Sequence, residues 1–269
     1  IIGYGKLGGI ELGYGSDLDL VFIHNAPPSS MTDGKRSVAA DVFFARLAQR
    51  MIHILTTRTP SGQLYEVDMR LRPNGKSGLL VTPLGAFRSY QENDAWTWEH
   101  QALVRARGIA GDTQVITEFG EIRNDIIQRK RDNRELVGEV VKMREKMREN
   151  LDKSNDELFD VKQGHGGITD IEFMVQYLLL RYSSDYPALC HYSDNIRQLE
   201  ALEEAQLLDE HLAERLAGIY RVLRAAHHRY SLQEKPAIIP ADELMEERHI
   251  VHEAWELLMH APPSMQEKA

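Results

Sequence analysis

The sequence contains only one cysteine, Cys190, among 269 residues. A lone cysteine excludes an intramolecular disulfide framework and fits a reducing compartment, so we expect a cytoplasmic protein. No apolar run approaches the ~20 residues that a membrane-spanning helix needs, so we expect no membrane partner. Hydrophobic residues nevertheless make up 42% of the chain. That share is enough for a sizeable core and argues against wholesale disorder.

Negative charge exceeds positive charge in the second part of the chain. Residues 1–115 carry 12 Lys and Arg against 11 Asp and Glu, whereas residues 116–269 carry 20 against 30. Such an acidic half argues against a general DNA- or RNA-binding role, so we expect no nucleic-acid partner. Most of these charges are expected to lie on solvated helix faces.

Strand and helix signals alternate in the first part of the chain, and helical periodicity dominates after Asp112. We therefore expect an α+β protein, with a catalytic domain over 1–115 and an all-α helical bundle over 116–269. The catalytic domain would hold a small mixed sheet with flanking helices. Residues 1–5 resemble the end of a strand, so we expect more sequence ahead of them in a longer protein. Strands are predicted at 1–5, 17–24, 64–71 and 79–81, and helices at 7–12, 37–57, after 82–83, and at 92–106, 113–129, 134–151, 168–183, 194–206, 209–232 and 242–260.

Three carboxylates stand in two of the predicted strands. Asp17 and Asp19 are two residues apart, so they project from the same face, while Leu18 and Leu20 point into the core. If Asp68 comes from a neighbouring strand, all three carboxylates converge. Like charges held together need a cation between them, and hard oxygen ligands suit Mg²⁺ or Mn²⁺ with substrate phosphates completing the shell.

An isolated Asp-x-Asp more often caps a turn at the start of a strand than binds a metal. The preceding Gly15 and Ser16, the apolar alternation and the second acidic strand favour the metal site. Gly15 lets the backbone approach a phosphate, and Ser16 can donate a hydrogen bond to it. Lys6, in a glycine-rich turn about ten residues earlier, is a candidate phosphate contact at a helix N-terminus.

Arg70 and Arg72 alternate with their neighbours and are expected on the same strand face as Asp68. Cations beside a metal cluster can hold polyphosphate through forked hydrogen bonds. The alternative is that they pair with Asp68 and fix its geometry, and both roles are compatible. Lys76, in the glycine-rich loop that follows, could close over the nucleotide.

Two further segments have less specific patterns. In 96–107, Trp96 and Trp98 are expected to anchor a helix in the core, whereas Arg105 and Arg107 either cap its C-terminus or touch phosphate or a protein substrate. In 164–172, the glycines and the acidic residues that can cap a helix favour an interdomain joint over a direct substrate contact.

In combination, these segments closely resemble glutamine synthetase adenylyltransferase, a bifunctional enzyme family with two nucleotidyltransferase domains of the polymerase-beta-like superfamily. The resemblance covers nearly the whole chain. It is carried by Gly3-Tyr4-Gly5-Lys6-Leu7-Gly8-Gly9, Glu11-Leu12-Gly13-Tyr14-Gly15-Ser16-Asp17-Leu18-Asp19-Leu20, Tyr65-Glu66-Val67-Asp68-Met69-Arg70-Leu71-Arg72-Pro73, and the segments 96–107 and 160–173.

The resemblance implies that this is the AMP-attaching, C-terminal copy. Such a domain transfers AMP from ATP to a tyrosine of glutamine synthetase with release of pyrophosphate, down-regulating nitrogen assimilation. It implies Asp17, Asp19 and Asp68 as ligands of Mg²⁺ or Mn²⁺ and as catalytic residues, and Gly15 and Ser16 as phosphate contacts. Expected partners are ATP, glutamine synthetase and, through the longer enzyme, a PII signal protein.

Three alternatives stay open from the sequence alone. The first is the family's reverse activity, phosphorolytic removal of AMP. The second is a non-catalytic module that binds nucleotide and PII, although a silent domain has no need of three costly carboxylates. The third is a polymerase or tailing enzyme of the same superfamily, against which the acidic helical half counts.

Overall fold

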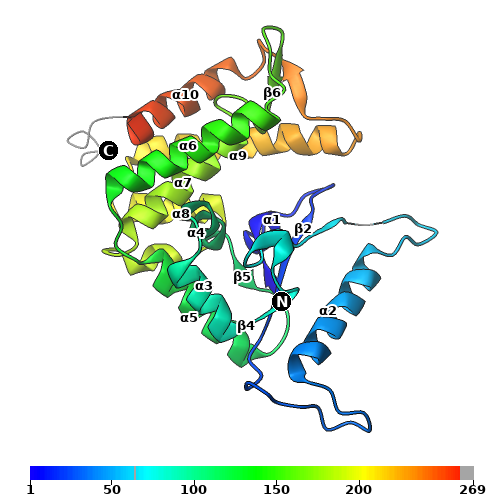
Figure 1. Cartoon of the computed structure of the whole chain (residues 1–269). Helices are drawn as coiled ribbons and strands as arrows, with labels where there is room; N and C mark the ends of the chain where they lie inside the picture. The colour runs from blue at the N-terminus through cyan, green and yellow to red at the C-terminus, as the bar shows by residue number, and fades with distance from the viewer. Residues whose placement is uncertain (64, 261–269) are drawn as a thin grey trace. The chain divides into compact units, whose positions relative to one another are not determined.

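The computed structural model describes residues 1–63 and 65–260. The chain divides into two compact units, Ile1–Ile126 and Ile127–Ala269 (Figure 1). The first unit contains a five-stranded sheet with helices, and the second is mostly helical, so the predicted α+β class is confirmed. In the part of the chain that the structure covers, no helix combines the length and the apolar character that crossing a bilayer requires.

The central strand of the sheet is β2 (Leu18–His24). On one side it pairs antiparallel with β1 (Ile2–Gly3), which in turn pairs antiparallel with β5 (Arg107–Gly108). On its other side β2 runs parallel to β3 (Val67–Asp68) at its start and to β4 (Val81–Pro83) at its end.

The apolar residues of β2 form the core of the first unit, as the alternation predicted. Leu20 and Phe22 are buried in one cluster with Ala48 and Val81, and Leu18 packs against it. Burying these side chains on one side of β2 fixes which side chains of the strand face the other way.

The strand predicted at 64–71 is much shorter in the structure. Leu64 lies outside the described residues, and β3 contains only Val67 and Asp68. The cause is local, because the Asp68 carboxylate accepts a hydrogen bond from the backbone N–H of Arg70 at 2.8 Å. Such a side-chain bond two residues along turns the backbone out of the sheet ladder. The strand predicted at 79–81 begins instead at Val81 and leads through Pro83 into α3 (Leu84–Asn93).

The helices of the first unit partly match the prediction. The long helix expected over 37–57 is α2 (Ala40–Thr56). The first helix is α1 (Gly5–Gly8) rather than 7–12, because Ile10 adopts a left-handed φ of 56° that ends any helical path. The last helix, α5 (Thr113–Ile127), lies close to its predicted place.

The prediction of a single helix over 92–106 was wrong. The chain leaves α3 at Asn93 and starts a new helix, α4 (Thr97–Val104). The break is stabilised by Glu99, whose carboxylate accepts hydrogen bonds from the Trp96 backbone N–H at 3.0 Å and from the Tyr90 hydroxyl at 2.8 Å. This is the returning half of a capping box.

The second unit contains the predicted helices, close to their expected bounds. It also contains a small antiparallel sheet of β6 (Leu158–Asp160) and β7 (Ile238–Pro240), so the predicted helical region is confirmed as mostly helical, with two short strands that the prediction did not include. The two strands have three residues each and come from distant parts of the sequence, so neither shows a recognisable alternation. The helices are α6 (Asn133–Leu151), α7 (Ile168–Tyr182), α8 (Asn195–Glu204), α9 (Glu210–Ser231) and α10 (Met245–Trp255).

The acidic residue at the start of α7 has a buried partner within the same unit. Asp170 is 2% exposed and accepts hydrogen bonds from Arg144, which is fully buried, at 2.6 Å and from Arg148 at 3.0 Å. Its second oxygen accepts the Gly166 backbone N–H at 2.8 Å. Asp170 thus supports the helix start from the third helical position, whereas Thr169 makes no capping bond.

Candidate active site

The parallel pairing of β2 with β3 brings two of the three predicted carboxylates together. In this pairing Leu18 stands opposite Val67, and Asp19 stands opposite Asp68. Residues in register on neighbouring parallel strands project from the same face of a sheet, so the two aspartates are side by side. Asp17 lies two residues before Asp19, immediately ahead of the strand, and is exposed.

The glycine-rich turn at Tyr4 and Gly5 packs closely against Asp19. Tyr4 donates its backbone N–H to the Asp19 carbonyl at 2.9 Å. Gly5 follows with a left-handed φ of 53°, and a Cβ built there would lie 2.4 Å from Asp19 Oδ2. Only glycine allows the backbone and the carboxylate to come this close.

Asp68 is held by the arginine two residues further along. Arg70 Nε donates a hydrogen bond to Asp68 Oδ2 at 2.6 Å, Nη2 forms an ion pair with the same oxygen at 2.5 Å, and the Arg70 backbone N–H donates to Oδ1 at 2.8 Å. The hydrogen bond from the Arg70 guanidinium holds the pKa of Asp68 below its usual range, and Lys76 adds a further favourable charge.

The other two carboxylates also affect the pKa of Arg70. Its pKa is raised, first by the hydrogen bond to Asp68 and then by the charges of Asp68, Asp19 and Asp17. The three aspartates are therefore all near the Arg70 guanidinium. Their carboxylate oxygens are donors of the kind that Mg²⁺ and Mn²⁺ prefer.

The three carboxylates are not closed around a common point. Within residues 1–63 and 65–260, no group of three or more His, Cys, Asp or Glu side chains is arranged to hold a metal ion. A physical reason is visible at Asp68, because both of its oxygens are directed to Arg70. The carboxylates of Asp17, Asp19 and Asp68 are suitable ligands for a divalent cation. In this structure the Arg70 guanidinium is bound to one of them, Asp68.

The turn ahead of Asp17 has the geometry expected of a backbone that can approach a ligand. Gly15 has a left-handed φ of 69°, which favours glycine. Ser16 donates its backbone N–H to the Gly13 carbonyl at 3.1 Å, and its hydroxyl oxygen accepts the Gly13 N–H at 3.1 Å. The hydroxyl hydrogen of Ser16 remains available to donate to a phosphate.

The three predicted cations take different positions. Lys6 is half-buried in α1, directly after Gly5. Arg70 is on Asp68. Arg72 does not share that face, because the strand ends at Asp68; its guanidinium donates to the carbonyls of Met69, Lys76 and Gly78 at 2.8, 3.1 and 3.4 Å. Arg72 therefore stabilises the loop that carries Lys76.

The two arginines that follow α4 have structural partners. Arg105 forms a buried ion pair with Glu11, and Arg107 donates to the carbonyls of Gly8 and Leu7 at 2.9 and 3.3 Å. Both connect the end of α4 to the glycine-rich turn. The expectation that both tryptophans anchor the core was wrong for Trp96, whose surface is 70% exposed.

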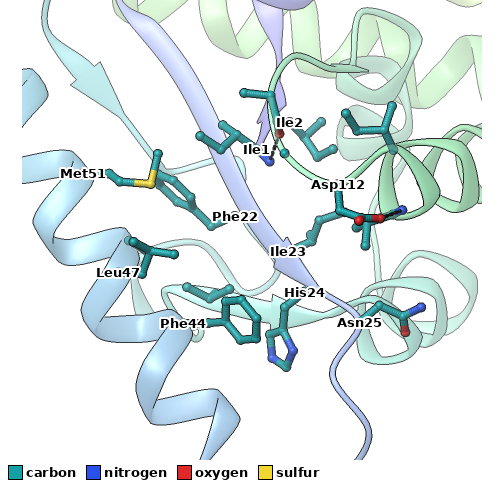
Figure 2. Close-up of a pocket in the computed structure, with 16 residues that line it drawn as sticks. Ile1, Ile2, Phe22, Ile23, His24, Asn25, Phe44, Leu47, Met51 and Asp112 are labelled. Atoms are coloured by element: carbon teal, nitrogen blue, oxygen red, sulfur yellow. Dashed lines mark hydrogen bonds between the residues drawn. The ribbon is translucent and has the colours of Figure 1, made fainter. Parts of the chain in front are cut away.

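A separate apolar cavity of about 310 Å³ lies between β2, α2 and the start of α5 (Figure 2). Figure 2 shows Phe22, Phe44, Leu47 and Met51 around it, with His24 at its edge. His24 stacks on Phe44 and pairs with Asp41. None of the predicted site residues lines this cavity, so the chemistry of the carboxylates, rather than the cavity, defines the candidate site.

Sequence reasoning missed two residues that build the site. Gly5 belongs to the glycine-rich motif, but nothing in the sequence shows that its missing side chain makes room for Asp19. Glu11 was not singled out, because its buried partner Arg105 is 94 residues away. A local sequence pattern cannot predict an ion pair between residues so far apart in the chain.

Two family models match parts of the chain. One, described as glutamate-ammonia ligase adenylyltransferase, matches residues 1–122. The other, described as GlnD PII-uridylyltransferase, matches residues 141–237. The first match contains every residue predicted for the site.

Curated relatives give the same result over most of the chain. It is 55% identical over 261 residues to the bifunctional glutamine synthetase adenylyltransferase/adenylyl-removing enzyme of Hahella chejuensis. It is 52% identical over 267 residues to the enzyme of the same name from Pseudomonas putida. Each match covers 95% of this chain and 27% of the relative, so the chain spans about a quarter of the length of these proteins.

Proposed function

We propose that the chain, whose residues 1–122 match the family model described as glutamate-ammonia ligase adenylyltransferase, transfers AMP from ATP to a tyrosine hydroxyl of glutamine synthetase, releasing pyrophosphate. The observation that carries the proposal is the register of Asp19 with Asp68 on neighbouring parallel strands, with Arg70 paired to Asp68.

In this proposal Asp17, Asp19 and Asp68 would hold Mg²⁺ or Mn²⁺, which would supply positive charge to favour ionisation of the attacking hydroxyl and to offset the charge of the leaving pyrophosphate. The unperturbed pKa of tyrosine is about 10, so a tyrosine hydroxyl needs such help to act as a nucleophile near neutral pH.

The chain's own groups then position the triphosphate. Gly15 lets the backbone approach, and the Ser16 hydroxyl donates to a phosphate oxygen. Arg70 and Lys6 supply positive charge at the edge of the site, and Arg72 keeps the following loop in place. Catalysis of phosphoryl and nucleotidyl transfer depends mainly on positioning and charge, which are the properties these residues provide.

The partners follow from the same proposal. The protein substrate is glutamine synthetase, as the names of the relatives suggest. A PII signal protein would act through the longer enzyme, and the setting would be nitrogen regulation in the cytoplasm.

The test is incubation of the chain with ATP labelled at the α-phosphate, Mg²⁺ and glutamine synthetase, beside the double variant Asp17→Asn, Asp19→Asn. The proposal predicts label on glutamine synthetase with the wild-type chain and none with the variant. Equal labelling by both would remove the assigned role of the aspartates.

A parallel reaction separates attachment from removal. Adenylylated glutamine synthetase is incubated with inorganic phosphate, and ADP is measured. ADP formation without any labelling in the first reaction would assign the chain to AMP removal and contradict the proposed direction.

A further inference from the structure

The ligand that the proposed metal site needs most is engaged by the protein itself. Asp68 accepts one hydrogen bond from the Arg70 guanidinium on one oxygen, which also forms an ion pair with Nη2, and one hydrogen bond from the Arg70 backbone on the other oxygen. A guanidinium and a divalent cation compete for the same carboxylate oxygens. A carboxylate in this arrangement therefore has to exchange one cation for the other before it can bind metal.

The exposed position of the Arg70 side chain allows it to dissociate from Asp68. Its side chain is 69% exposed, whereas that of Asp68 is 16% exposed. Across residues 1–63 and 65–260, the only hydrogen bonds and ion pairs of the Arg70 side chain are those to Asp68. Releasing the guanidinium therefore breaks no hydrogen bond or ion pair to any other residue of the described fold.

Arg72 provides the contrast within the same segment. Its guanidinium donates to three backbone carbonyls of the loop, and its side chain is half-buried. Moving Arg72 would leave these carbonyls without their donors. Of the two arginines, only Arg70 is free of such a structural task.

We propose that Arg70 is a positioning residue that occupies Asp68 in the absence of nucleotide and transfers to the triphosphate when nucleotide and metal bind together. This inference rests on the proposed function. An arginine fork matches phosphate oxygens as well as it matches a carboxylate, so the guanidinium exchanges its contacts with Asp68 for forked hydrogen bonds to phosphate. The consequence is that metal alone binds weakly, whereas metal and nucleotide assist each other.

The test measures Mn²⁺ binding to the whole chain by electron paramagnetic resonance, with and without a non-hydrolysable ATP analogue. Arg70→Gln removes the competing cation and keeps a similar size. We expect it to bind Mn²⁺ alone about threefold to fivefold more tightly, in keeping with the modest strength of an exposed ion pair. With the analogue present, we expect at least tenfold weaker nucleotide binding, because a forked phosphate contact is lost.

Two variants serve as controls. Arg88→Gln removes an exposed arginine that is likewise paired with an aspartate, Asp125, at 2.9 Å but lies on α3, and should leave both affinities unchanged. Arg70→Lys keeps the charge without the fork, and should recover weak Mn²⁺ binding but only part of the nucleotide affinity.

The opposite signs of the two effects distinguish this role from a structural one. An Arg70→Gln variant that weakens both affinities, or changes neither, overturns the inference. The double variant Asp17→Asn, Asp19→Asn separates this failure from failure of the proposed function. If that variant binds Mn²⁺ as well as the wild-type chain, the proposed metal site itself is wrong and both proposals fall.

Discussion

Replacing Gly5 with alanine should damage the site far more than it damages the fold. Gly5 has a left-handed φ of 53°, and the added Cβ would lie 2.4 Å from Asp19 Oδ2. An L-residue in this conformation costs about 1–2 kcal/mol. For a chain of this size that loss corresponds to a decrease in Tm of about 2–8 °C.

The contact with Asp19 adds an effect on geometry. An ordinary contact to a Cβ is about 3.4 Å or longer, so the carboxylate has to move by about 1 Å. A displacement of that size in a catalytic group can reduce the rate about 100-fold. We therefore expect Gly5→Ala to remain folded and to lose about two orders of magnitude in AMP transfer.

Gly75→Ala is the matched control. Gly75 has a φ of 54°, almost the same as Gly5, but the nearest atom to its added Cβ is the Arg70 carbonyl oxygen at 3.6 Å. Thermal unfolding and initial rates of AMP transfer are measured for both variants. Similar decreases in Tm with a rate loss confined to Gly5→Ala are expected, whereas equal rates in the two variants would refute the assigned role of Gly5.

Two further predictions concern ion pairs. Asp170→Asn leaves the fully buried Arg144 without its charged partner, so we expect denaturant unfolding to show a loss of about 3–5 kcal/mol; a change below about 1 kcal/mol would contradict the assignment. The pKa of Asp68 is lowered by Arg70, so the pair stabilises the fold above the unfolded pKa of about 4 and loses its effect as the pH falls through the lower, folded value. Because Arg70 is 69% exposed, the effect on stability should be under about 1 kcal/mol, and an NMR titration in Arg70→Gln should show the pKa of Asp68 rising; an unchanged pKa would mean that Arg70 is not the cause of the shift.

Residues with a repeating local pattern were predictable from the sequence. The central strand was visible because Leu18 and Leu20 alternate with Asp17 and Asp19 ahead of the apolar run Val21-Phe22-Ile23, and α2 because its apolar residues recur at helical spacing. The same alternation correctly placed the side chains of Leu18 and Leu20 in the core.

The failures occur where a single contact overrides the pattern. The strand expected over 64–71 ends at Asp68 because its own side chain bonds the Arg70 N–H. The helix expected over 92–106 breaks ahead of Trp96 because Glu99 caps a new start. The strands β6 and β7 were missed because each has three residues and a distant partner.

For the candidate site, the sequence supplied the residue types but not their pairings. Spacing alone predicted Asp17 and Asp19 on one face, and the register of β2 with β3 was needed to bring Asp68 beside Asp19. Pairing of Arg70 with Asp68 was one of two roles considered. The different position of Arg72 depends on where the strand ends, which alternation does not reveal.

The most direct test of the proposed metal site is anomalous diffraction from crystals of the chain grown with Mn²⁺ and a non-hydrolysable ATP analogue. We predict a manganese peak within coordination distance of Asp17, Asp19 and Asp68, with the Arg70 guanidinium on the phosphates. A manganese peak elsewhere, or triphosphate bound away from these aspartates, would contradict it.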